Sequence, residues 1–179
     1  MGSDGIPKTA SRATRTPGCV RLFAMDIDGT LTDGSITTYR DETAMHMCVL
    51  DGLGIQRVIE AGIIVAWISG RTSDAVQSRA AQLGVAEVWL GEEDKLARLK
   101  EIAVRHSIAP EDIAYMGDDL PDLPAMRYCG YAFAPPNAVP PVRREAACVT
   151  KNRGGHGAVR EVCERILGAA ASNGLGMRA

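Results

Sequence analysis

Short apolar runs that each end abruptly in polar residues constrain the fold of this chain more than any other feature. Such runs occur at Leu22–Met25, Ile63–Ile68, Val85–Leu90 and Ile113–Met116. A continuous apolar run is typical of a strand that is buried on both faces of a parallel sheet. Because helix-like segments separate the runs, the order predicts right-handed βαβ units. The expected fold is a Rossmann-like α/β fold with helices on both faces of the sheet.

Less regular segments complete the predicted fold. Ile36–Tyr39 and Ala44–Val49 flank a polar turn at residues 40–43, which predicts a protruding β-hairpin. This hairpin and one helix fill the interval from Asp28 to Ser69, so we expect no cap domain. Apolar periodicity and short apolar runs predict the remaining elements. They are a helix from Asp51-Gly52 to Gly62, a helix with Val76, Ala80 and Leu83 on its apolar face, helices at Glu92–His106 and Ala158–Leu167, and strands at Tyr131–Ala134 and Ala147–Val149.

Length and composition limit the class of protein. The chain of 179 residues has the size of one domain, which we place at residues 19–170 between a disordered tail (1–18) and a flexible tail (171–179). A net charge of −2 argues against a nucleic-acid partner, and no apolar run approaches the ~20 residues of a membrane span. The first 18 residues lack the apolar core of a signal peptide. The five cysteines form no C-x-x-C pair, which predicts reduced thiols in a cytoplasmic protein.

Polar side chains gather where the apolar runs end. Asp26 and Asp28 follow the first run, Ser69 follows the second, Asp118 follows the fourth, and Lys95 lies near the start of the helix after the third. The carboxyl ends of parallel strands share one edge, where open α/β sheets bind ligands. Magnesium prefers oxygen ligands, and aspartate can form an aspartyl-phosphate. Each residue alone fits an ordinary turn, cap or solvated helix position, but together they predict a site for Mg²⁺ and phosphate.

Four groups of residues occur in a characteristic order, namely Asp26-Ile27-Asp28-Gly29-Thr30, Ser69, Lys95 and Gly117-Asp118-Asp119. Through them the chain resembles the haloacid dehalogenase-like phosphatases. It is similar to the small, capless group that contains 3-deoxy-D-manno-octulosonate 8-phosphate phosphatase and nonulosonate 9-phosphate phosphatases. The resemblance runs from about Leu22 to Leu167. It also includes Asp33-Gly34, Asp51-Gly52-x-Gly54-Ile55, Ile68-Ser69-Gly70-Arg71, Leu120-Pro121-Asp122 and Gly154-Gly155-His156-Gly157-Ala158-Val159-Arg160-Glu161.

The resemblance implies a reaction and the residues that perform it. Asp26 would attack the phosphoryl group, and Asp28 would act as general acid and then as general base. Mg²⁺ would be held by Asp26, the main-chain carbonyl of Asp28, and Asp118, while Ser69 and Lys95 would hold the phosphate. Three further residues would support the site: Thr30, Asp119 and Asp122. The expected activity is the magnesium-dependent hydrolysis of 3-deoxy-D-manno-octulosonate 8-phosphate.

Substrate recognition is where the chain departs from the family pattern. Leu50 and Gln56 stand where the octulosonate enzymes carry arginines, and leucine cannot make the bidentate contacts of a guanidinium. A nonulosonate 9-phosphate or another sugar phosphate therefore stays open as the substrate. The resemblance implies a substrate-binding set made of Asp28, Cys48, Val49, Leu50, Asp51, Gly52, Gln56, Arg71, Arg79 and Lys95.

The resemblance also implies an oligomer. Related phosphatases are homotetramers in which the hairpin builds the subunit contact, so we expect residues 36–49 at an interface. A capless site excludes water poorly, so either the substrate is large or neighbouring subunits close the site. We expect a glycine-rich segment to reach the neighbour's active site: Gly154, Gly155, His156 and Gly157.

Two other classes of protein fit part of the pattern. A signalling receiver domain also accepts phosphate on an aspartate, but it lacks a second aspartate at the position of Asp28. A non-catalytic domain of this fold that serves only in oligomerisation usually loses motif residues, and this chain has kept the core set. The sequence therefore favours an enzyme, a phosphoric monoester hydrolase.

Overall fold

A six-stranded parallel sheet forms the centre of the molecule, as the sequence predicted. The computed structural model describes residues 19–39 and 42–172, so most of both predicted tails lies outside the described residues. The strand order is β5-β4-β1-β6-β7-β8, and each neighbouring pair is parallel. The strands are β1 (Leu22–Met25), β4 (Ile64–Ser69), β5 (Glu87–Leu90), β6 (Ile113–Met116), β7 (Tyr131–Ala134) and β8 (Cys148–Val149). The first strand therefore lies inside the sheet, between β4 and β6.

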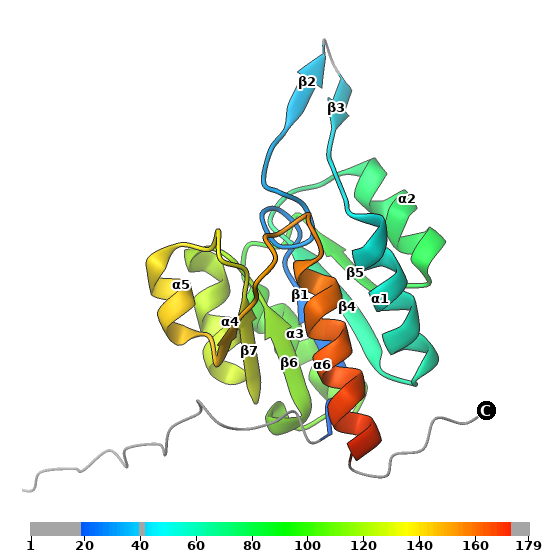
Figure 1. Cartoon of the computed structure of the whole chain (residues 1–179), viewed down its shortest axis with the longest axis vertical. Helices are drawn as coiled ribbons and strands as arrows, with labels where there is room; N and C mark the ends of the chain where they lie inside the picture. The colour runs from blue at the N-terminus through cyan, green and yellow to red at the C-terminus, as the bar shows by residue number, and fades with distance from the viewer. Residues whose placement is uncertain (1–18, 40–41, 173–179) are drawn as a thin grey trace, which may run out of the picture.

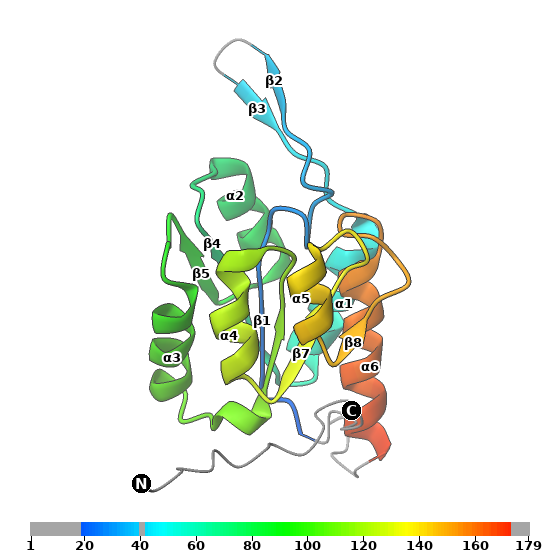
Figure 2. The same cartoon turned by 90° about the vertical axis from the view of Figure 1, so that its left-hand side faces the viewer.

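Helices cover both faces of the sheet (Figures 1 and 2). One face carries α1 (Val49–Glu60), α2 (Asp74–Leu83) and α6 (Ala158–Ser172), and the other carries α3 (Lys95–Arg105), α4 (Leu123–Tyr128) and α5 (Pro140–Glu145). Two short 3₁₀ turns, η2 (Pro110–Asp112) and η3 (Leu120–Asp122), precede β6 and α4. No helix within the described ranges is both long and apolar enough to cross a membrane.

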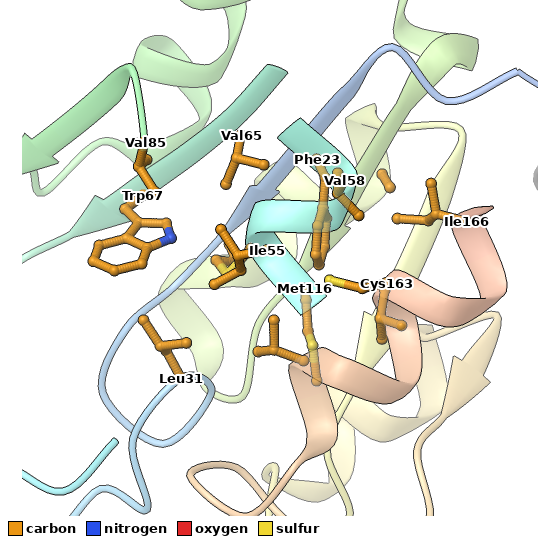
Figure 3. Packing of buried hydrophobic residues seen from close by; sticks show 14 of the residues in the cluster. Phe23, Leu31, Ile55, Val58, Val65, Trp67, Val85, Met116, Cys163 and Ile166 are labelled. Carbon is orange, nitrogen blue, oxygen red and sulfur yellow. The ribbon is translucent and has the colours of Figure 1, made fainter. Parts of the chain in front are cut away.

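The buried core has two halves because successive strand residues point to opposite faces. In β1, Phe23 and Met25 face α1, α2 and α6, whereas Leu22 and Ala24 face α3, α4 and α5. Figure 3 shows side chains of α1 and α6 meeting Phe23 on the first of these faces. Since β1 is buried on both sides, the residues that directly follow it are held firmly at the sheet edge.

The hairpin projects away from the body of the molecule (Figure 1). It consists of β2 (Thr37–Tyr39) and β3 (Glu42–Ala44), and Thr37 pairs with Ala44. The prediction of a hairpin was right, but its second strand was placed wrongly. Strand β3 begins within the expected polar turn and ends at Ala44, and Met47 then forms an isolated bridge with Thr32 before α1 begins.

Several boundaries differ from the sequence prediction for local physical reasons. Helix α1 begins at Val49, before the predicted start, so that Asp51 lies in its first turn. Helix α6 continues past the predicted end at Leu167 to Ser172, because its alanine-rich last turns favour helix. The six-residue helices α4 and α5 were not predicted. Both have proline at an early helical position, where its missing N–H costs nothing, although proline in a sequence first suggests a loop.

Candidate active site

Asp26 and Lys95 form a buried ion pair at the carboxyl edge of the sheet. Asp26 directly follows β1, and its N–H donates to the carbonyl of Met116 in the neighbouring strand. Lys95 is the first residue of α3, and Nζ lies 2.6 Å from Asp26 Oδ1 and 2.8 Å from Asp122 Oδ1. All three side chains are buried. One lysine is therefore shared between two carboxylates in a place that water hardly reaches.

Asp122 organises the neighbouring loop through both of its oxygens. Its Oδ1 accepts from the Tyr115 hydroxyl at 2.9 Å, and its Oδ2 accepts from the N–H groups of Asp118 and Asp119. A Cβ on Gly117 would lie 2.4 Å from the Asp122 side chain, so only glycine fits there. Sequence reasoning missed Tyr115, since a tyrosine within an apolar strand is usually interpreted as a residue of the hydrophobic core. The only signal for it was a hydroxyl in a run that is otherwise apolar.

Asp118 completes a cluster of acids that suits a cation. One carboxylate oxygen from each of Asp26, Asp118 and Asp122 lies within 4.8 Å of the others. Burial, followed by repulsion from Asp122, raises the pKa of Asp26 well above its usual value, and the same causes raise the pKa of Asp118 to about 6. Burial lowers the pKa of Lys95, but attraction to Asp26 and Asp122 outweighs it and the pKa is raised. Oxygen donors at this spacing, with more negative than positive charge, fit a hard divalent cation.

The loop after β1 lies directly against Asp118. Gly29 has a φ of +88°, and a Cβ there would lie 2.1 Å from Asp118 Oδ2. Thr30 reaches the same residue, with its hydroxyl 3.5 Å from Asp118 Oδ1. The N–H of Gly29 donates to the Thr32 hydroxyl, which was not among the predicted site residues. The backbone of this loop is thus fixed within contact distance of the acid cluster.

Asp28 and Ser69 open onto a pocket beside the cluster. The Ser69 hydroxyl donates to Asp28 Oδ2 at 3.3 Å and accepts from the N–H of Arg71 at 3.1 Å. The pocket has a volume of about 260 Å³ and is lined by these three residues, by Met45 from the base of the hairpin, and by residues 72–76. It is a polar hollow between the end of β4, the start of α2 and the hairpin.

Other predicted substrate residues lie away from this pocket in the single chain. Leu50 lines a second groove of about 640 Å³, together with His156 and Gly157. Gln56 is exposed on α1, and the Arg79 guanidinium lies beside Gly52. Cys48 is the N-cap residue of α1, and Val49 is 76% exposed at its start. Asp119 caps η3, where its carboxylate accepts from the N–H of Leu120.

Asp51 binds the glycine-rich segment from inside the molecule. Its fully buried carboxylate accepts from the N–H groups of Gly157 and Arg160 at 3.2 and 2.7 Å, at the start of α6. This contact holds the segment at residues 154–157 against its own chain. A Cβ on Gly154 would lie 2.0 Å from the Gly29 carbonyl oxygen, and one on Gly155 would lie 2.4 Å from the Asp33 nitrogen. That the segment also reaches a neighbouring subunit stays a prediction.

Comparison with known proteins gives a consistent family. Residues 81–162 match the family model described as haloacid dehalogenase-like hydrolase. The 3-deoxy-D-manno-octulosonate 8-phosphate phosphatase of Escherichia coli strain K12 is 40% identical over 149 residues, which are 83% of this chain and 79% of the relative.

Solved structures agree with this result. The 3-deoxy-D-manno-octulosonate 8-phosphate phosphatase of Moraxella catarrhalis, in complex with magnesium ion, phosphate ion and a KDO molecule, superposes with a TM-score of 0.85 at 41% identity and covers 88% of this chain and 91% of its own. The Yersinia pestis enzyme of the same description has a TM-score of 0.87 at 37% identity and covers 90% of this chain and 88% of its own. The chain therefore belongs to the haloacid dehalogenase-like hydrolases, in the group of 3-deoxy-D-manno-octulosonate 8-phosphate phosphatases.

Proposed function

We propose that this protein is a magnesium-dependent phosphomonoesterase that hydrolyses 3-deoxy-D-manno-octulosonate 8-phosphate (KDO 8-phosphate) to KDO and phosphate. The observation that carries the proposal is the buried Asp26–Lys95 pair with Asp118 beside it, at the edge where the parallel strands end. Relatives that carry this activity in their names match most of the chain, and one of them holds magnesium, phosphate and KDO.

Asp26, Asp118 and the main-chain carbonyl of Asp28 are the groups that would hold Mg²⁺. Asp122 lies in the same cluster, but its oxygens already accept from Lys95, Tyr115 and two backbone N–H groups. We therefore assign Asp122 a supporting role. When bound, Mg²⁺ supplies positive charge that offsets the repulsion between a phosphate dianion and the acid cluster.

The chain's own residues carry the covalent steps. A carboxylate oxygen of Asp26 attacks phosphorus while the bond from phosphorus to the sugar oxygen breaks, and Asp28 gives its proton to that leaving oxygen. Asp28 then takes a proton from the water that attacks the aspartyl-phosphate, which releases phosphate and restores Asp26. Lys95 favours the ionised form of Asp26, against the burial and the Asp122 charge that raise the pKa of this carboxyl, and it neutralises charge in both transition states.

Ser69 and Arg71 are placed to receive the substrate. Ser69 borders the pocket, and its hydroxyl, which donates to Asp28 in the structure, would donate to a phosphate oxygen when substrate binds. Arg71 is exposed at the same pocket, where a guanidinium suits the carboxylate of a sugar acid. Leu50, Gln56 and Arg79 would meet the substrate only as part of an assembly, since in one chain they lie outside the pocket.

We also propose a homotetramer in which the hairpin and the start of α1 meet neighbouring subunits. The support is a set of exposed apolar side chains on the first turns of α1, with Val49, Leu50 and Leu53 exposed by 76%, 58% and 48%. They lie next to the protruding hairpin in the chain. Burial of such side chains contributes about 25 cal/mol per Å² of apolar surface, which favours association.

A cytoplasmic location is part of the proposal. All five cysteines are free thiols in the structure, and Cys129 and Cys163 are buried. Free buried thiols are usual in proteins of reducing compartments. Cell fractionation with antibody detection tests this location.

The central test is steady-state turnover of a panel of phosphates with Mg²⁺. We expect the highest kcat/KM for KDO 8-phosphate, a lower value for a nonulosonate 9-phosphate, and a much lower value for an aryl phosphate. A preference for a nonulosonate 9-phosphate would support the phosphatase activity but contradict KDO 8-phosphate as the substrate. Stable phosphorylation of the protein without turnover would instead favour a receiver-like domain.

A further inference from the structure

The segment at residues 137–139, which follows β7, contacts the loop after β1 and the loop after β6. The side-chain Nδ2 of Asn137 donates to the carbonyl of Gly29 at 2.8 Å, next to Asp28. Two residues further on, the N–H of Val139 donates to the carbonyl of Asp118 at 2.9 Å. One short stretch of chain therefore holds the backbone of the loop after β1 and that of the loop after β6. These loops supply the acids of the site.

Asn137 has a second partner on the opposite side. Its Oδ1 accepts from the N–H of Gly154 at 2.8 Å. Because one partner is a carbonyl and the other an N–H, only one orientation of the amide satisfies both, and no other side-chain type of this size offers a donor and an acceptor in this arrangement. Gly154 is buried, so loss of this acceptor would leave a buried N–H without a partner.

Gly29 is the residue through which the bridge formed by Asn137 affects the site. Its positive φ and its close approach to the Asp118 carboxylate leave the peptide little room to shift without contact. Its N–H is held by Thr32, and its carbonyl is held by Asn137. The peptide groups on both sides of Gly29 are thus each held by a side chain. Any displacement of Gly29 changes the positions of Asp28 and Asp118 relative to each other.

We propose that Asn137 is a positioning residue that sets the Asp28–Gly29 backbone against Asp118 and links it to the glycine-rich segment at residues 154–157. This inference rests on the phosphatase function proposed above. Asn137 touches neither phosphate nor metal in the proposed mechanism. It therefore acts by setting the positions of the reacting groups. Misplacement of such groups by about 1 Å can cost on the order of a hundredfold in rate.

Two substitutions separate the two hydrogen bonds of the bridge. Asn137→Ala removes both bonds. Asn137→Asp keeps an acceptor for the Gly154 N–H but places an oxygen opposite the Gly29 carbonyl. Thr150→Val is the matched control, because it removes the hydroxyl that donates to the carbonyl of Asn152 at 2.8 Å in the same region without touching Gly29.

Turnover of KDO 8-phosphate and of an aryl phosphate is measured for each variant across a range of Mg²⁺ concentrations. We expect both Asn137 variants to lose about tenfold or more in kcat, with a higher Mg²⁺ concentration for half-activation and a KM within about twofold. Thr150→Val keeps the wild-type kcat even where its melting temperature falls. A wild-type kcat and Mg²⁺ response in Asn137→Ala would overturn the proposal.

Hydrogen exchange of the Gly154 amide, followed by NMR on the metal-free protein, gives a readout that does not depend on activity. It should be faster in Asn137→Ala and close to wild type in Asn137→Asp and Thr150→Val. Exchange that is unchanged in Asn137→Ala would also overturn the bridge. If the wild type turns over the aryl phosphate but not KDO 8-phosphate, the proposed substrate fails, whereas the Asn137 comparison is still decided by the aryl phosphate.

Discussion

Lys95 opposes the effect of burial on Asp26, the proposed nucleophile. Burial favours the protonated form of Asp26, yet only the carboxylate can attack phosphorus. The ammonium group of Lys95 at 2.6 Å favours the ionised form. One lysine cannot balance Asp26, Asp118 and Asp122 together, however. A phosphate dianion would enter an already negative site, so turnover requires a further cation.

The first prediction concerns Asp26→Asn. We expect turnover to fall below detection, because the amide cannot form the aspartyl-phosphate. The metal-free protein should be at least as stable as wild type near neutral pH, because one carboxylate leaves a crowded buried cluster. Phosphate release and thermal melting measure the two effects. Asp94→Asn is the control, since it changes an exposed helix N-cap beside Lys95 and should keep full activity.

The second prediction concerns pH and Mg²⁺. The pKa of Asp118 is about 6 in the folded chain, against about 3.9 in an unfolded chain. The folded state holds this proton more tightly, so the free energy of unfolding falls as pH rises from about 4 through about 6. Mg²⁺ competes with the proton. We therefore expect the rise in melting temperature caused by saturating Mg²⁺ to be larger at about pH 8 than at about pH 5.

Asp118→Asn provides the comparison for this prediction. It removes one of the proposed carboxylate ligands of Mg²⁺, so the rise in melting temperature with Mg²⁺ should be small at both pH values. Equal rises in the wild type at both pH values would contradict the assignment of Asp118 to the metal site.

Strand ends explain which site residues the sequence could predict. Asp26, Lys95 and Asp118 were expected at one edge because parallel strands share it, and the structure places them there. Tyr115 and Asn137 could not be found in this way. Tyr115 is singled out by its contact with Asp122 and Asn137 by its contacts with Gly29 and Gly154, and no local sequence pattern marks such contacts.

At the scale of elements, α1 and α6 behave as one unit. They pack closely at Gly54, where a Cβ would lie 2.9 Å from Arg160 Cδ and 3.2 Å from Cys163 Cβ. The Asp51 carboxylate from α1 binds N–H groups at the start of α6, a place usually filled by a residue just before the helix. Its negative charge also suits the positive end of the α6 dipole.

The third prediction tests this connection. Asp51→Ala leaves two N–H groups near the start of α6 without their acceptor, so we expect the free energy of unfolding to fall by roughly 2–4 kcal/mol. Urea denaturation measures the loss. Glu161→Ala also removes an acceptor for two backbone N–H groups, those of Lys151 and Asn152, but these residues are exposed. A loss at Asp51 no larger than at Glu161 would contradict the prediction.

Long periodic or apolar elements were predictable, and short ones were not. The central strands and α2, α3 and α6 follow patterns that span several residues. The hairpin register and the start of α1 depend on how the chain between β1 and α1 meets the rest of the molecule. Helix α5 begins with Pro140-Pro141, a sequence that does not by itself predict a helix. The packing of Val142 into the core stabilises α5 instead.

At the scale of the whole molecule, the projecting hairpin lies at the end of the sheet where the parallel strands have their carboxyl ends (Figure 2). Met45, at the base of the hairpin, lines the pocket with Asp28 and Ser69. Exposed apolar side chains follow on the first turns of α1. A neighbouring subunit that packs on these side chains would therefore also border the open pocket.

The fourth prediction concerns this surface. Leu53→Glu should convert the proposed tetramer into smaller species, as measured by light scattering after size exclusion, because a carboxylate in an apolar contact loses its hydration. Val104→Glu is the matched control. Val104 is also an exposed apolar residue, 79% exposed on α3, and its substitution should leave the assembly unchanged. A wild-type protein that is strictly monomeric and still selective for one sugar phosphate would contradict the proposed assembly.

During synthesis on the ribosome, β1 is made long before the strands that flank it. It pairs with β4 on one side and with β6 on the other, and β6 begins only at Ile113. A nascent chain that ends before Ile113 leaves β1 as an open edge strand. The bridge from Asn137 to Gly154 forms later still. Translation therefore delivers Asp26 well before the residues of the proposed bridge, so we expect newly made protein to gain activity only after Gly154 has been synthesised.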